Sequence, residues 1–194
     1  MTAPGPEAAP PRKRRRRLPG DPPAPAPVAR MLRVDQAGEY GARRIYEGQL
    51  AVLGRTRSGP MLRHMWEQEK LHLQAFDDLL PERRVRPTLL SPLWHVAGFA
   101  LGAGTALLGS RAAMACTVAV EETIDRHYAA QAEALEGRSE EVDLRDTIER
   151  FRAEELEHRD TALANEAELA PAYPLLSAAV RAGSRAAIWL SERL

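Results

Sequence analysis

The sequence predicts an all-α protein whose helices pack as a bundle around one core. Apolar residues recur every three or four positions along most of the chain after Val28, which is the spacing of a helix face. Gly- and Pro-rich stretches interrupt this pattern at intervals that suit short connections between helices. No run alternates between apolar and polar residues for long enough to form a convincing strand. With 194 residues, the chain is long enough to bury a sizeable core.

Six helices are expected, and their boundaries follow from these interruptions. Pro60 fits the first turn of the second helix, where its missing N–H is harmless. Ser139 is a candidate N-cap for the fifth, because Glu140 and Glu141 follow it and favour the positive end of the helix dipole. The expected helices are, in chain order, 30–54, 58–80, 93–108, 111–137, 140–166 and 173–192.

Residues 1–29 are predicted to form a disordered tail that precedes one folded domain at 30–194. The tail is rich in Pro and Ala and contains a basic run from Arg12 to Arg17. No apolar stretch follows this run, so it does not resemble a secretory signal. It is either a solvated tail or an attachment to anionic lipid. Nucleic-acid binding is not favoured, because no aromatic residues interleave the basic run and the rest of the chain is acidic.

The segment 96–109 differs from the other expected helices because it carries no charge. Its length of about 14 residues is short of the roughly 20 that a helix needs to span a bilayer. It is therefore either a buried core helix or an interfacial segment that faces one leaflet of a membrane. Gly98 and Gly102 are four residues apart, a spacing that lets another helix or a lipid tail approach closely.

Four expected helices place a carboxylate at the centre of an otherwise apolar face, and two of them add a histidine three residues later. An unpaired charge buried on such a face costs several kcal/mol or more, so it requires a partner. In each half of the chain a single Glu precedes a Glu-x-x-His pair by a similar number of residues. The six residues are Glu39, Glu69, His72, Glu121, Glu155 and His158.

This pattern is typical of helix bundles that hold two iron or two manganese ions between carboxylates. Carboxylates neutralise the charge of the ions, imidazole adds a neutral donor, and the i, i+3 spacing lets Glu and His reach one ion from one helix face. A single Glu-x-x-His would more often be a solvated face. Two copies inside apolar stripes favour a metal site, without distinguishing iron from manganese. The neighbouring Glu122, Glu154 and Glu157 are not expected to be ligands.

The chain from residue 30 to its end resembles the demethoxyubiquinone hydroxylase (Coq7) family of ubiquinone biosynthesis. The segments that carry the resemblance are "RVDQAGEYGARRIYEGQLAVL" (33–53), "MWEQEKLHL" (65–73), "RPTLLSPLWHVAGFALGAGTALLG" (86–109), "MACTVAVEETIDRHY" (114–128), "FRAEELEHRD" (151–160), "AELAPAYP" and the final "SERL". The loop near 136–145 is shorter than the family pattern leads us to expect, and residues 1–29 lie outside the resemblance.

The resemblance implies a ferritin-like four-helix bundle with two additional helices, one of them apolar and membrane-facing. It also implies a di-iron monooxygenase that uses O₂ to hydroxylate the ring of a polyprenylated demethoxyubiquinol, late in ubiquinone biosynthesis. Carried over by position, the family's ligands to two iron ions fall on the same six residues. The expected location is peripheral, on the inner face of a cell membrane or of the mitochondrial inner membrane. The electron donor stays open, and other ubiquinone-biosynthesis proteins are candidate partners.

Two further expectations concern residues near the predicted ions. Tyr128 lies two turns beyond Glu121 on the same face, so it is either an electron or proton relay or an ordinary core residue. Gly38 and Gly41 flank Glu39 and leave room for a substrate or for close helix packing.

Two other functions compete with the hydroxylase. A ferritin- or rubrerythrin-like protein would use the same centre for iron or peroxide, although one cysteine cannot supply a rubrerythrin's Cys₄ iron site. A non-catalytic quinone-binding scaffold would leave the paired Glu and His residues unexplained.

Overall fold

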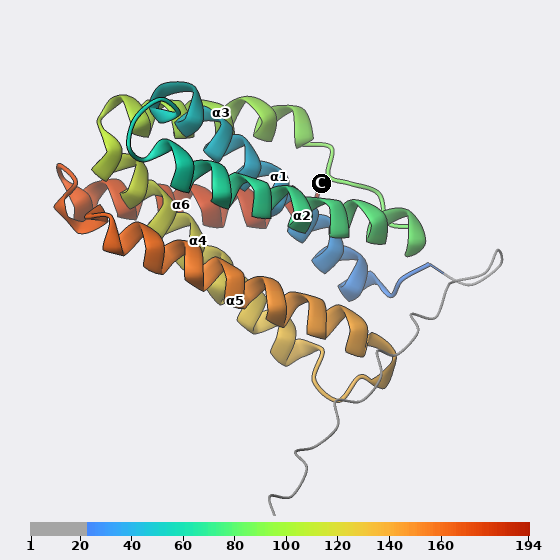
Figure 1. Ribbon diagram of the computed structural model, residues 1–194. Coiled ribbons are helices and arrows are strands. Elements are labelled where there is room, and N and C mark those ends of the chain that lie inside the picture. The colour runs from blue at the N-terminus through green and yellow to red at the C-terminus, as the bar shows by residue number, and fades with distance from the viewer. Residues whose placement is uncertain (1–22) are drawn as a thin grey trace, which may run out of the picture.

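The computed structural model describes residues 23–194, and within them the protein is entirely helical, as predicted. Figure 1 shows the helices packed lengthwise against one another. Two short 3₁₀ helices, η1 (Ser139–Glu141) and η2 (Ala167–Leu169), lie on either side of the fifth α-helix in the sequence. The α-helices are α1 (Ala26–Leu53), α2 (Gly59–Glu82), α3 (Ser91–Leu107), α4 (Ser110–Ala134), α5 (Val142–Ala164) and α6 (Tyr173–Ser191).

The bundle is built from two helical pairs, α1 with α2 and α4 with α5, and the two additional helices pack on its outside. Helix α3 lies along α1, and α6 lies along α4 (Figure 1). The ferritin-like arrangement predicted for this chain, with four bundle helices and two more, is therefore confirmed. Helix α3 is the apolar one of the added pair.

Two apolar clusters fill the bundle, one on each side of the Glu and His residues along every bundle helix. One cluster includes Leu32 of α1 and Phe76 of α2, together with Ile148 of α5. The other includes Leu62 of α2 and Met114 of α4. The six polar residues thus lie between two dry layers, which exclude water from the middle of the bundle.

Two helix starts differ from the sequence prediction. Helix α1 begins at Ala26, four residues before the predicted position, so the last residues of the predicted tail are helical. Pro27 suits the first turn and Val28 is fully buried, which anchors this end of the helix. The serine predicted as N-cap of α5, Ser139, instead begins η1, and α5 begins at Val142. Residues 1–22, which include the basic run, lie outside the described residues.

Helix α3 packs on α1 with almost no side-chain separation, because glycines face each other across the contact. A Cβ atom built on Gly102 would lie 1.9 Å from the Ile45 carbonyl oxygen, and one built on Gly48 would lie 2.3 Å from that of Phe99. The predicted small-residue spacing therefore serves the approach of another helix. The opposite face of α3 is open, with the side chains of Val96 and Leu107 largely exposed.

Helix α3 is neither a fully buried core helix nor a segment that is apolar and exposed all round. One side is a packed helix contact, and the other is an apolar surface. Among residues 23–194, no helix combines the length and the hydropathy needed to cross a bilayer.

Replacing Gly102 with alanine should lower the free energy of unfolding by about 1–3 kcal/mol, because the added methyl group collides with backbone atoms of α1. Gly104 is the matched control. It lies on the exposed side of α3, and a Cβ there meets no described atom within 4 Å. Gly104→Ala should raise the free energy of unfolding by up to about 1 kcal/mol through helix propensity. Denaturant unfolding measures both, and equal effects would contradict the close contact.

Candidate metal centre

The structure brings the six predicted residues together in the middle of the bundle, each at most 2% exposed. They form two overlapping groups of four, and within each group one potential ligand atom per residue lies within 4.8 Å of the others. The first group is Glu39, Glu69, His72 and Glu155, and the second is Glu69, Glu121, Glu155 and His158. Glu69 and Glu155 belong to both groups, which is the arrangement expected of carboxylates that bridge two ions.

Both histidines turn the same ring nitrogen, Nδ1, toward the carboxylates. His72 Nδ1 lies 3.0 Å from Glu155 Oε1 and 3.5 Å from Glu39 Oε2. His158 Nδ1 lies 3.2 Å from Glu69 Oε1 and 3.2 Å from Glu155 Oε2. One imidazole donor is therefore available to each group of four.

The cluster carries more negative charge than its own protein partners satisfy. Neither carboxylate oxygen of Glu69 has a hydrogen-bond partner among residues 23–194, and the same holds for Glu39 Oε2 and Glu121 Oε2. Buried acceptors without donors are costly, and divalent cations are the partners that would satisfy several of them at once. The donor set therefore fits metal ions.

Burial and mutual repulsion change the protonation of the cluster. Burial, reinforced by the charge of Glu155, raises the pKa of Glu69 and of Glu121 well above the ordinary value for a carboxyl. Burial alone would lower the pKa of His72, but the nearby carboxylates of Glu155 and Glu39 raise it to about 12. Burial and repulsion therefore both favour the protonated forms of Glu69 and Glu121.

The thermal stabilisation that metal ions provide should grow as the pH rises. The pKa values of Glu69 and Glu121 are raised in the folded state, so the stability linked to their protons is present at low pH and is lost as the pH rises. Bound ions displace those protons and remove this loss. Thermal unfolding with and without Mn²⁺ should show a larger metal-induced rise at about pH 8 than at about pH 6. Equal rises would contradict proton displacement.

Two tyrosines donate hydrogen bonds to the carboxylates that belong to only one group each. Tyr46 on α1 donates to Glu121 Oε1 at 2.9 Å, and Tyr128 on α4 donates to Glu39. Tyr128 therefore contacts a predicted ligand, although it also packs against Phe76. Tyr46 was not among the residues predicted to lie near the ions. The available signal was that each tyrosine follows the single Glu of its own helix by seven residues.

The three glutamates predicted not to be ligands lie outside both groups of four. Glu122 pairs with Arg181 of α6 at 3.1 Å, and Glu157 is exposed. Glu154 is different, because its Oε2 lies 2.6 Å from His72 Nε2, the ring nitrogen that faces away from the cluster. Sequence reasoning missed this contact.

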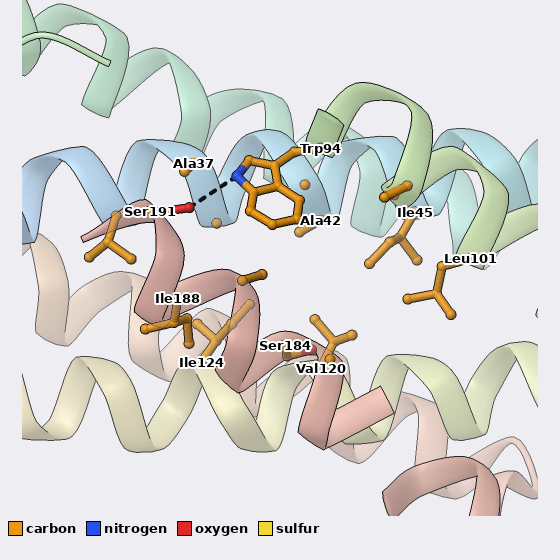
Figure 2. A pocket seen from close by; sticks show the side chains of 17 residues that line it. Ala37, Ala42, Ile45, Trp94, Leu101, Val120, Ile124, Ser184, Ile188 and Ser191 are labelled. Atoms are coloured by element: carbon orange, nitrogen blue, oxygen red, sulfur yellow. Dashed lines mark hydrogen bonds between the residues drawn. The ribbon is translucent and has the colours of Figure 1, made fainter. Parts of the chain in front are cut away.

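An apolar cavity of about 370 Å³ lies beside the centre, between α1, α3, α4 and α6. Figure 2 shows Ile45, Leu101, Val120 and Ile124 pointing into it from three helices, while α6 contributes Ile188. The indole N–H of Trp94 is bonded to Ser191 Oγ at 3.0 Å, which ties α3 to the end of α6 (Figure 2).

Chain neighbours of two predicted ligands form part of the cavity wall. Gly38 and Gly41 line it beside Glu39, and Val120 lines it beside Glu121. A Cβ on either glycine would meet no atom of the described chain within 4 Å. Of the two uses expected for these glycines, the structure supports room for another molecule.

Comparison with known proteins identifies the family of this chain. The family profile described as "Ubiquinone biosynthesis protein COQ7" matches residues 26–191. The 3-demethoxyubiquinol 3-hydroxylase of Rhodospirillum rubrum is 62% identical over 179 residues, which are 92% of this chain and 84% of that protein. The human NADPH-dependent 3-demethoxyubiquinone 3-hydroxylase, mitochondrial, is 59% identical over 171 residues, 87% of this chain and 79% of its own. A Saccharomyces cerevisiae relative, 5-demethoxyubiquinone hydroxylase, mitochondrial, is 45% identical over 180 residues, 85% and 77% of the two chains. The chain therefore belongs to the COQ7 family of ubiquinone biosynthesis proteins.

Proposed function

We propose that this protein uses O₂ to hydroxylate the ring of a polyprenylated demethoxyubiquinol, and that two iron ions held by the six buried Glu and His residues support the reaction. The observation that carries the proposal is that residues next to the buried cluster in the chain also line an apolar cavity. Gly38 precedes Glu39 and Val120 precedes Glu121, and both line the cavity, while Glu39 and Glu121 belong to the carboxylate-rich cluster. An apolar quinol and a redox metal centre could meet there.

The protein's own residues would perform three tasks in this reaction. A di-iron centre, when bound, supplies the electrons and the binding site that activate O₂. The six residues would hold the ions, with Glu69 and Glu155 available to both, and the carboxylates together would offset the positive charge. Tyr46 would hold the carboxylate of Glu121 in place through its hydroxyl group, and Tyr128 would do the same for Glu39. The apolar layers on both sides would keep water from the reacting oxygen.

The cavity supports the choice of a quinol as substrate. Its walls are made of aliphatic, glycine and alanine residues with few polar groups, which suits a prenyl chain. Gly38 and Gly41 would let a flat ring approach Glu39 more closely than larger side chains allow. Helices α3 and α6 form the outer wall, and their exposed leucines would guide the chain toward lipid.

The decisive experiment is a hydroxylation assay on purified protein loaded with Fe²⁺. A water-soluble, short-chain demethoxyquinol is added with ¹⁸O₂ and a reductant, and NADPH, which the relatives' names specify, is the first donor to use. Product containing one ¹⁸O atom on the ring would support the proposal. Iron oxidation or peroxide consumption without product would favour the ferritin- or rubrerythrin-like alternative. Quinol binding with neither metal nor product would favour a scaffold.

We also propose that the open face of α3 contacts a membrane surface. The exposed side chains include Leu93, Val96 and Leu107 of α3 and Leu108 directly after it, so large apolar residues gather at this helix. This contact would place the protein peripherally on the inner face of a cell membrane or of the mitochondrial inner membrane. It would also give a lipid-borne quinol a short route to the cavity.

Val96→Glu combined with Leu107→Glu should weaken binding to liposomes by about tenfold or more, because both carboxylates would enter the apolar layer. Leu101 is a poor choice for this test, since it points into the cavity. Sedimentation with liposomes measures the effect, and turnover on the water-soluble quinol serves as the control. Unchanged liposome binding would contradict the membrane contact.

A further inference from the structure

The two halves of the metal centre repeat each other across an internal two-fold relation. Glu39 and Tyr46 on α1 correspond to Glu121 and Tyr128 on α4, and each tyrosine donates to the glutamate of the other helix. Likewise, the Glu-x-x-His pair of α2 corresponds to that of α5. If this symmetry were complete, the two metal positions would be chemically equivalent.

The symmetry is broken at the residue that precedes each bridging glutamate. On α2 this residue is Gln68, and on α5 it is Glu154. Each reaches across to the histidine of the opposite helix. His72 Nε2 lies 2.6 Å from Glu154 Oε2, whereas His158 Nε2 lies 3.0 Å from Gln68 Oε1. One imidazole is therefore paired with a carboxylate and the other with a neutral amide.

The geometry assigns the protons of both rings. In each histidine Nδ1 faces the carboxylate cluster and Nε2 faces an oxygen acceptor, so Nε2 carries the hydrogen when Nδ1 binds a metal. A carboxylate that accepts such a hydrogen bond draws the proton toward itself and makes the opposite nitrogen a stronger donor. A neutral amide oxygen does this less, because it carries no net charge.

We propose that Glu154 is a positioning residue that makes the two metal positions unequal, so that the ion beside His72 is held more tightly than the ion beside His158. Glu154 itself belongs to neither group of potential ligands. It acts through the ring of His72, which also stacks on Phe151 with a centroid distance of 4.1 Å. This inference rests on the metal centre proposed above and adds an order of filling to it.

Stepwise metal binding by the full-length, metal-free protein tests the inference. Co²⁺ is the probe, because its visible absorption reports the ligands and calorimetry gives each affinity. Glu154→Gln should weaken the tighter step by about 10- to 100-fold and leave the weaker step nearly unchanged. Gln68→Glu should tighten the weaker step. In the double variant, Gln68→Glu with Glu154→Gln, the order of the two positions should be exchanged.

Single ligand variants assign the steps, because Glu39→Gln removes a ligand only from the group that contains His72, and Glu121→Gln only from the other. The inference is overturned if the unmodified protein fills both positions with equal affinity, or if Glu154→Gln weakens both steps alike. A protein that binds no Co²⁺ in any form would instead overturn the metal centre itself. If Glu154 only supported the fold, the double variant would not exchange the order in which the two metal positions fill.

Discussion

Glu69→Gln is expected to abolish binding of both metal ions and to reduce quinol hydroxylation by roughly a thousandfold or more. Glu69 belongs to both groups of four, so its loss removes a ligand from each ion. Glutamine keeps the size of the side chain, which separates the loss of charge from any loss of packing. Metal analysis of the purified variant and the ¹⁸O₂ assay measure the two effects.

A carboxylate that belongs to only one of the two groups of four provides the matched control. Glu39 belongs to one group only, so Glu39→Gln should reduce the metal content to about one ion per chain while the group around His158 persists. Activity should still fall, because the reaction needs the pair of ions. Full occupancy by two ions in Glu69→Gln would show that the shared glutamates do not bridge them.

Glu69→Gln should not destabilise the metal-free protein, although it abolishes metal binding. Both oxygens of Glu69 are buried without hydrogen-bond partners within residues 23–194, and Glu155 and Glu39 add repulsion. A neutral amide lowers these costs. The metal-free variant should therefore unfold at a temperature equal to or above that of the metal-free parent. A clear decrease would mean that Glu69 supports the fold rather than the metal site.

The sequence was sufficient to predict which six Glu and His residues gather in the middle of the bundle, for a physical reason. Helical periodicity determines which residues share a face, and a carboxylate in an apolar stripe must have a partner. Both statements use only positions within one helix. The six buried residues accordingly lie where the periodicity predicts.

The contacts that sequence reasoning missed all depend on how separate helices are placed. Glu154 lies beside the apolar stripe of α5 and looks like a surface residue, yet it reaches His72 on α2. Tyr46 lies seven residues after Glu39 and so shares its helix face, but only the placement of α1 beside α4 shows that it donates to Glu121. The start of α1 was misjudged because a Pro-rich composition is typical of disorder, while the buried contacts of Val28 are tertiary.

Gly41→Leu should leave the fold and the metal content intact while reducing turnover by about a hundredfold. Gly41 lines the cavity beside Glu39, and a side chain there meets no described atom at its first carbon, so the leucine would extend into the cavity. It would occupy space that a quinol ring needs, and small displacements of a substrate from the reacting atom cost about this much. Leucine also favours the helix over glycine, so stability should not fall.

Gly104→Leu is the control for this prediction, because it adds the same side chain to an exposed position on α3 that lies outside the cavity. The assay uses the water-soluble quinol, so any altered membrane contact of Gly104→Leu has no effect on it.

Three outcomes of this comparison are distinguishable. If the quinol must enter the cavity, Gly41→Leu loses turnover although it still binds two metal ions, and Gly104→Leu keeps its turnover. Normal turnover in Gly41→Leu would mean that the quinol ring reaches the ions from another side of the bundle. A joint loss of metal and turnover would mean that the glycine is needed for the position of Glu39 instead. Metal content and turnover measured on the same preparations therefore distinguish a blocked substrate from a damaged centre.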